Sequence, residues 1–143
     1  MAVRLIRRFG FSAAHLYRRP EWSAEENERR FGKCCRPPGH GHNYRLTVEV
    51  AGDPDSETGF VVGLDELDEL VRLEVLAFVD HRHLNEALPE FAVGASIPSC
   101  ENLVLWARDR LAAALPAGCR LASVSIFEDD DLGAAWSAAD PAA

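Results

Sequence analysis

The stretch "HGHNYRLTVEV", residues 40–50, contains the clearest secondary-structure pattern in the chain. From position 42 onward one parity holds His42, Tyr44, Leu46, Val48 and Val50, and the other holds Asn43, Arg45, Thr47 and Glu49. Successive side chains of a strand point to opposite faces of a sheet. The alternation therefore predicts a half-buried strand over residues 42–50, with one face toward a core.

A similar alternation precedes this stretch. Between residues 3 and 15 one parity holds Val3, Leu5, Phe9, Phe11, Ala13 and His15. Ile6 and Arg7 interrupt the pattern, but most positions fit a long first strand. If residues 3–15 form one strand, the His15 side chain points to the same face as the phenylalanines.

Helical spacing appears in three segments. Apolar residues three and four positions apart predict an amphipathic helix over residues 65–79, with Asp65 as its N-cap and with Leu67, Leu70, Val71, Val75 and Phe78 on its apolar face. Ser99 is expected to cap a second long helix over residues 100–115. Ser23 is expected to cap a short helix over "AEENERRF". The segment from residue 80 to residue 98 is interpreted as a loop.

The C-terminal part alternates again. Ala122, Val124, Ile126 and Glu128 share one parity, which predicts a last strong strand, and residues 134–136 are expected to add a weak edge strand. The predicted fold class is α+β, with an antiparallel four-stranded sheet and two helices on one face. We expect a single domain over residues 1–143, in which residues 129–143 form a partly flexible tail.

Composition narrows the possible functions. The 143 residues carry a formal net charge of −8, which disfavours a general nucleic-acid surface because such surfaces need a basic face. No long apolar run is present, and Arg4, Arg7 and Arg8 interrupt the N-terminal segment, so neither a membrane span nor a signal sequence is expected. The protein is therefore expected in the cytoplasm. Its four cysteines lack CxxC spacing and are expected to be free thiols.

Histidines at the predicted strand ends suggest a metal site. His40 and His42 are two residues apart, so period-two alternation puts both imidazoles on one face. A His-x-His pair alone can also be a polar strand end. His15 supplies a third imidazole at the end of another strand. Three neutral imidazoles would leave the fourth position of a tetrahedral zinc open, as in catalytic zinc sites.

Two acidic positions could take part in chemistry. The adjacent pair Asp80 and His81 could orient a general base, although the residues alone favour the simpler interpretation of a solvated helix end. Glu128 continues the buried parity of the last strand, so its carboxylate could accept hydrogen bonds from ligand N–H groups in a cleft, or it could already have left the sheet.

The cysteines are interpreted separately. Cys34 follows Lys33, whose positive charge would favour a thiolate, and a thiol serves as general base only when its pKa is brought toward neutrality. Cys35, Cys100 and Cys119 fit the simpler role of small buried apolar residues.

Six segments in order, "FGFSAAH", "EENERRFGKC", "GHGHNY", "VDHRHLN", "SCENLVLWA" and "SIFED", resemble the 6-pyruvoyl-tetrahydropterin synthase family. The resemblance extends from Phe9 to Glu128. It implies a tunnelling fold, in which subunits with an antiparallel sheet and two helices join into a trimeric barrel. Two trimers stack as a homohexamer, with active sites between subunits.

The resemblance also implies roles for individual residues. The zinc ligands would be His15, His40 and His42. Cys34 would be the catalytic base, assisted by Asp80 and His81. Glu128 would anchor the pterin ring, and the segment Ser99, Cys100 and Glu101 would line the same pocket. This segment departs from the family, whose pyruvoyl enzymes commonly have two threonines before the glutamate. Lys33, Arg36 and Arg82 are candidates for binding a triphosphate.

The implied substrate is 7,8-dihydroneopterin triphosphate, which loses triphosphate to give 6-pyruvoyl-tetrahydropterin. Two alternatives stay open. The first is the 6-carboxy-tetrahydropterin synthase of the queuosine pathway, which uses the same substrate and releases acetaldehyde. The second is a zinc- or pterin-binding module without turnover. A branch with glutamate in place of the cysteine is disfavoured, because no Glu lies between Arg29 and His40. Whether Cys34 or Cys35 is the base also stays open.

Overall fold

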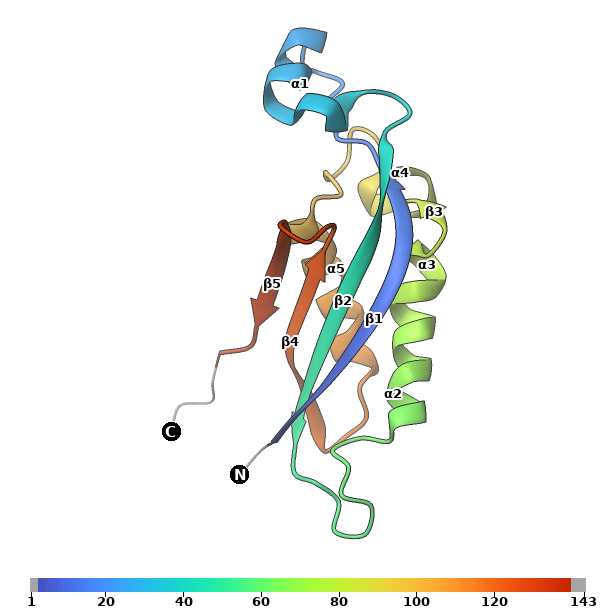
Figure 1. Ribbon diagram of the computed structural model, residues 1–143, viewed down its shortest axis with the longest axis vertical. Coiled ribbons are helices and arrows are strands. Elements are labelled where there is room, and N and C mark those ends of the chain that lie inside the picture. Colours follow the sequence, from blue (N-terminus) through green and yellow to red (C-terminus); the bar gives the residue numbers. More distant parts are fainter. Residues whose placement is uncertain (1–2, 140–143) are drawn as a thin grey trace.

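In the computed structural model, which describes residues 3–139, one sheet of five strands has the order β3-β1-β2-β4-β5 (Figure 1). The strands are β1 (Val3–His15), β2 (His40–Gly52), β3 (Arg82–His83), β4 (Cys119–Phe127) and β5 (Gly133–Ser137). The predicted strands over residues 3–15 and 42–50 are confirmed, as is the edge strand near residue 135. The predicted last strand is also present, but it ends at Phe127, so Glu128 lies just beyond it.

Strands β1 and β2 form the longest antiparallel pair. Their register places Phe11 opposite Tyr44 and His15 opposite His40. Phe11 and Tyr44 stack with ring centroids 4.7 Å apart and nearly parallel planes. The predicted buried parity of β2 is confirmed from Tyr44 to Val50, and His42 is half-buried.

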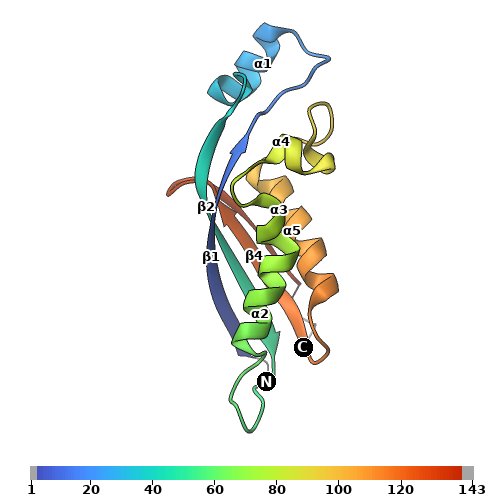
Figure 2. The same cartoon turned by 90° about the vertical axis from the view of Figure 1, so that its right-hand side faces the viewer.

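Two long helices, side by side in one layer, cover the buried face of the sheet (Figure 2). One consists of α2 (Leu64–Val71), a π-helical segment (Arg72–Leu76) and α3 (Ala77–Val79), and the other is α5 (Cys100–Ala114). Leu67, Val71 and Val75 from the first helix join Leu103, Ala107 and Leu111 from α5 in one apolar core with the sheet. Burial of this apolar area is the main favourable term for the fold.

Two details of the helix predicted over residues 65–79 are wrong. The helix begins at Leu64, and Gly63 rather than Asp65 is the N-cap residue. Phe78 was expected on the buried face but its exposed fraction is 38%. The π-helical segment explains this, because each π turn takes in an extra residue and rotates the following side chains. Val79 is buried instead, and the Arg110 guanidinium lies 4.2 Å from the centroid of the Phe78 ring.

The segment interpreted as one loop contains regular structure, so this prediction is wrong in part. It includes β3, the one-turn helix α4 (Leu84–Ala87) and a 3-10 turn (Pro89–Phe91). Strand β3 pairs in parallel with β1, so the sheet is mixed and has one strand more than the expected four antiparallel strands. Two residues are too few for an alternating pattern, which is why the sequence did not indicate β3.

The short helix after Ser23 is confirmed as α1 (Ala24–Phe31), and Ser23 Oγ accepts a hydrogen bond from the Glu26 backbone N–H. A 3-10 turn, Gly32–Cys35, follows it. In Figure 1, α1 lies beyond the ends of β1 and β2 where the candidate site is found. The expected tail from residue 129 onward includes β5, and residues 140–143 lie outside the described residues. None of the helices between residues 3 and 139 is long and apolar enough to cross a membrane.

Candidate metal centre

The end of β1 and the start of β2 carry the three histidines that the sequence singled out. The antiparallel register places His15 directly opposite His40, and Ala13 opposite His42. The three ring centroids are 4.9 Å apart in each of the three pairs. His40 and His42 share a face as predicted, and His15, the candidate third imidazole, completes a compact imidazole cluster with them.

The donor atoms of this cluster lie close together. His15 Nε2 is 3.3 Å from His40 Nε2. Within the described residues, two sets of possible metal ligands have all donor atoms within 4.8 Å of one another. One set is His15, Cys34 and His40, and the other is His15, His42 and Glu128. His15 belongs to both sets and is the central member of the site.

The Tyr44 side chain contacts the His15 ring at the nitrogen that faces away from the cluster. The Tyr44 hydroxyl lies 2.8 Å from His15 Nδ1, and the exposed fractions of the two residues are 1% and 0%. This contact turns Nε2 toward the cluster. Burial, followed by the charges of His42, His40 and His83, lowers the pKa of His15 to about 3. Burial also lowers the pKa of His40, so both rings are in the neutral form that metals bind.

The residues fit a metal ion. His42 Nε2 is buried without any hydrogen-bond partner among the described residues, and such a group normally carries an energetic cost. A metal would satisfy it. The donor set of imidazoles with a nearby thiol suits zinc and several other transition metals. In metal sites, a hydrogen bond to the ring nitrogen that does not bind the metal orients the histidine, and the Tyr44 hydroxyl makes such a contact with His15 Nδ1.

Cys34 lies at the edge of the same cluster. Its sulfur is 3.8 Å from His40 Nε2, and its carbonyl accepts a 2.8 Å hydrogen bond from the Tyr17 backbone N–H. Burial and then the charge of Glu128 raise the pKa of the Cys34 thiol, and the opposing charge of Lys33 is the smaller effect. Lys33 does lower the pKa of the Cys34 thiol, as expected, but burial and Glu128 outweigh it, so the pKa is raised overall.

The turn between Cys34 and His40 depends on Gly39. Its φ of +100° is in the region that side chains disfavour, and a Cβ atom there would lie 2.1 Å from the His15 carbonyl oxygen. A second contact holds the same turn, because His83 Nε2 lies 2.7 Å from the Pro38 carbonyl oxygen. The turn can therefore approach His15 only with glycine at position 39.

A cavity of about 450 Å³ adjoins the cluster. Glu128 directly follows β4 with an exposed fraction of 7%, and the Cys100 thiol donates to its Oε2 over 3.7 Å. Burial and then the Glu128 charge raise the pKa of Cys100 to about 12, which keeps this thiol protonated. The cavity is lined by Tyr17, Arg30, Phe31, Cys34, Ile97, Ser99, Cys100, Glu101, Glu128 and Leu132.

The cavity is lined by residues that the sequence analysis placed on separate elements, and also by residues that it did not assign to the site. Cys34, Ser99, Cys100, Glu101 and Glu128 all line it. Sequence reasoning did not assign Tyr17, Phe31 and Tyr44 to the site. A signal existed for Tyr44, which shares the parity of His40 and His42, whereas Tyr17 and Phe31 lie outside any periodic pattern.

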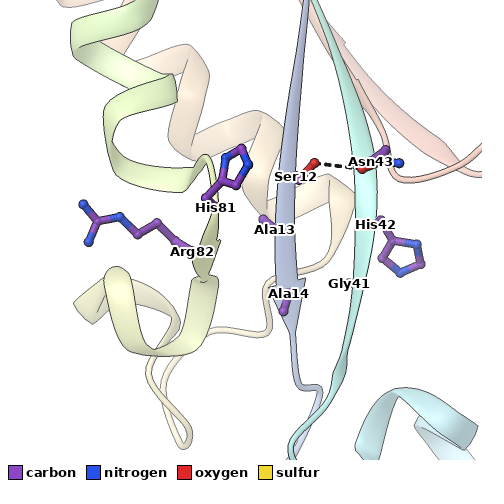
Figure 3. Close-up of a pocket in the computed structure, with 8 residues that line it drawn as sticks. All are labelled: Ser12, Ala13, Ala14, Gly41, His42, Asn43, His81 and Arg82. Carbon is purple, nitrogen blue, oxygen red and sulfur yellow. Dashed lines mark hydrogen bonds between the residues drawn. The ribbon is translucent and has the colours of Figure 1, made fainter.

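Asp80 and His81 do not line the 450 Å³ cavity. Asp80 Oδ1 accepts a 2.9 Å hydrogen bond from the Ser12 backbone N–H and lies 2.9 Å from His81 Nδ1. The pair belongs to the turn before β3, beside β1. Figure 3 shows His81 and His42 on opposite sides of the paired strands β1 and β2. A second cavity of about 430 Å³ lies at this place, and its lining includes His42 of the cluster as well as His81 and Arg82.

The three predicted cations differ in their surroundings. Arg36 pairs with the Glu28 carboxylate, which also accepts from the Cys35 thiol over 3.4 Å. Lys33 is exposed beside the imidazole cluster. Arg82 is exposed and lines the second cavity together with His81 and His42.

An α+β domain with clustered imidazoles, a thiol and a buried carboxylate around one cavity defines a protein equipped to bind a metal next to a small polar molecule. Comparison with known proteins gives the family. The family model described as 6-pyruvoyl tetrahydropterin synthase matches residues 4–138. The chain therefore belongs to the 6-pyruvoyl tetrahydropterin synthase family.

Individual relatives agree with this assignment. The human 6-pyruvoyl tetrahydrobiopterin synthase is 38% identical over 129 residues, which cover 90% of this chain and 87% of the relative. The structure of Caenorhabditis elegans 6-pyruvoyl tetrahydropterin synthase matches with a TM-score of 0.86 at 31% identity and covers 97% of both chains. A dihydroneopterin monophosphate aldolase from Pyrococcus furiosus is 31% identical over 93% of this chain and 96% of its own.

Proposed function

We propose that this chain is a zinc-dependent 6-pyruvoyl-tetrahydropterin synthase, a lyase that converts 7,8-dihydroneopterin triphosphate to 6-pyruvoyl-tetrahydropterin with loss of triphosphate. The observation that carries the proposal is the meeting of the imidazole cluster, Cys34 and Glu128 at one cavity, in a chain of this family. The family assignment supports a pterin substrate, and the geometry supports the roles proposed below for the three histidines, Cys34 and Glu128.

His15, His40 and His42 would hold the zinc ion, which supplies a Lewis acid that polarises the hydroxyls of the substrate side chain and so acidifies the adjacent C–H bond. The residues of the chain do the rest. The Cys34 sulfur is within reach of the same place and would accept the proton. Electron flow from the broken C–H bond then expels triphosphate from the neighbouring carbon. Tautomerisation and loss of the proton of the second hydroxyl, with the hydrogens taken up by the side chain and the pterin ring, then give the pyruvoyl product.

Glu128 would orient the pterin. Its buried carboxylate can accept hydrogen bonds from the N–H groups of the ring, which compensates for the cost of burying the charge. Cys100 donates to one of its oxygens and so holds the carboxylate in place. Ser99, Cys100 and Glu101 would line the pocket edge.

The roles proposed for Asp80 and His81 require a second subunit. In one chain Asp80 accepts from the Ser12 backbone N–H, and Figure 3 shows His81 and His42 on opposite sides of the paired strands β1 and β2. We therefore propose a homo-oligomer, a trimeric barrel or a hexamer of two trimers, in which the pair from one subunit assists Cys34 of another. We also propose that the enzyme works in the cytoplasm, which agrees with its four free cysteines.

The reaction is tested with purified, zinc-loaded protein and 7,8-dihydroneopterin triphosphate under anaerobic conditions. Mass spectrometry of the pterin and an assay for triphosphate should show the pyruvoyl product. Cys34→Ala should lose turnover. Cys119→Ala is the matched control, because Cys119 begins β4 and contacts the Pro116 carbonyl. No consumption of substrate by the wild type would contradict the proposal and favour a binding module without turnover.

The same experiment separates two other activities. Acetaldehyde with a 6-carboxy pterin would identify the 6-carboxy-tetrahydropterin synthase of the deazapurine pathway. Cleavage of the side chain of a dihydroneopterin phosphate would indicate the aldolase named for the Pyrococcus furiosus relative. Loss of turnover in Cys35→Ala but not in Cys34→Ala would identify Cys35 as the base.

The oligomer is tested by mixing two inactive variants, Cys34→Ala and His81→Ala, after partial unfolding and reassembly. Because each active site would take its thiol and its histidine from different subunits, a random equal mixture should regain roughly a quarter of the wild-type activity. No regained activity in a mixed oligomer of correct size would place both residues in one subunit's site.

A further inference from the structure

The Cys34 sulfur lies among the metal-binding nitrogens. It is 3.8 Å from His40 Nε2, which is 3.3 Å from His15 Nε2. All three donor atoms lie within 4.8 Å of one another. A general base that reaches only the substrate would not need to be this close to two metal ligands.

The separations agree with a tetrahedral ion. Zn–N bonds of about 2.0–2.1 Å and Zn–S bonds of about 2.3 Å at tetrahedral angles put two nitrogens about 3.4 Å apart, and a nitrogen and a sulfur about 3.6 Å apart. Both observed distances are close to these values. One ion could therefore contact His15, His40 and Cys34 with little movement of the side chains.

The backbone keeps this sulfur in place. The Cys34 carbonyl accepts a hydrogen bond from the N–H of Tyr17, two residues after His15, which ties the two segments together. The neighbouring Cys35 thiol donates to Glu28, away from the cluster. Of the two adjacent thiols, only Cys34 is directed to the metal site.

We propose that Cys34 is a ligand of the metal held by His15 and His40 while no substrate occupies the cavity. When the metal–sulfur bond forms, the thiol proton is released to solvent and no oxidation state changes. Arrival of the substrate hydroxyls breaks the metal–sulfur bond, and the sulfur keeps its electron pair. The displaced sulfur is then a deprotonated base beside the substrate; this second half of the inference rests on the proposed function.

Cobalt(II) provides a direct test of ligation. It replaces zinc in tetrahedral sites, and a thiolate ligand gives it a near-ultraviolet charge-transfer band that nitrogen and oxygen ligands do not give. Metal-free protein loaded with cobalt should show this band in the wild type and in Cys35→Ala. The band should be absent in Cys34→Ala, whose cobalt affinity should fall at least about tenfold while its histidines still bind the ion.

Several results would overturn the inference. One cobalt bound per wild-type chain without the band would show that Cys34 is not a ligand. A band lost in Cys35→Ala and kept in Cys34→Ala would assign the ligand to the other thiol. No cobalt binding at all would also remove the metal from the proposed function, so the two failures are distinguishable. Neopterin, which offers the side-chain hydroxyls without triphosphate, should weaken the band, and an unchanged band at saturation would refute the displacement step.

Discussion

The hydroxyl of Tyr44 is expected to strengthen metal binding at the candidate site through its contact with His15. Tyr44→Phe removes only the hydroxyl group. The remaining ring can keep its stacking on Phe11, where the centroids are 4.7 Å apart and the planes differ by 4°. The substitution therefore isolates the 2.8 Å contact with His15 Nδ1.

The size of the effect follows from burial. The exposed fractions of His15 and Tyr44 are 0% and 1%, so water does not reach Nδ1 without rearrangement of the core. An unpaired buried polar group costs about 1–3 kcal/mol, and we expect this loss in the free energy of unfolding. Loss of an outer contact to a metal ligand weakens metal binding about 10- to 100-fold, which corresponds to about 1.4–2.7 kcal/mol.

The assay is a zinc competition titration against a chromophoric chelator, with circular dichroism to confirm the fold. Tyr17→Phe is the matched control. The Tyr17 ring lies 4.5 Å from the His15 ring, but the described contacts include no hydrogen bond from its hydroxyl to His15. Zinc affinity should fall in Tyr44→Phe and stay near the wild-type value in Tyr17→Phe. Equal zinc affinities in the wild type and Tyr44→Phe would refute the role of the hydroxyl.

Three further predictions concern the supports of the site. Gly39→Ala should weaken zinc binding and lower the melting temperature more than Gly59→Ala, because both glycines have positive φ but only Gly39 lies against the His15 backbone; equal effects would contradict this. Asn85→Ala should lower the free energy of unfolding in urea by about 3 kcal/mol or more, since its amide makes three hydrogen bonds, two of them with Leu16; a loss below about 1 kcal/mol would count against it. The pKa of His15 falls from 6.5 to about 3 on folding, so only the unfolded chain binds a proton between these values. The stability of the chelator-treated protein should therefore be full above pH 6.5 and decrease toward pH 3, by up to about 1.4 kcal/mol per pH unit from this group. Urea titrations of His15→Gln should show a shallower slope, and an unchanged slope would assign the pH dependence elsewhere.

The periodic elements could be predicted from sequence because their patterns are local. Alternation identified β1, β2 and β4, and side-chain caps identified the starts of α1 and α5. The π-helical segment and β3 were missed for physical reasons. An inserted residue leaves the spacing of apolar residues almost unchanged, so packing alone reveals that Phe78 turns outward. A two-residue strand exists only because β1 offers it a pairing edge.

The sequence by itself determined which residue types were available and which strand face each would take, since alternation of side chains is a property of a single strand. It placed His15 with the phenylalanines, and His40 with His42, before any pairing was known. Only the tertiary structure decided that His15 lies opposite His40, that Tyr44 holds His15, and that the end of β4 brings Glu128 to the same cavity. Strand register and the meeting of distant elements depend on how the whole core packs, and local patterns do not contain that information.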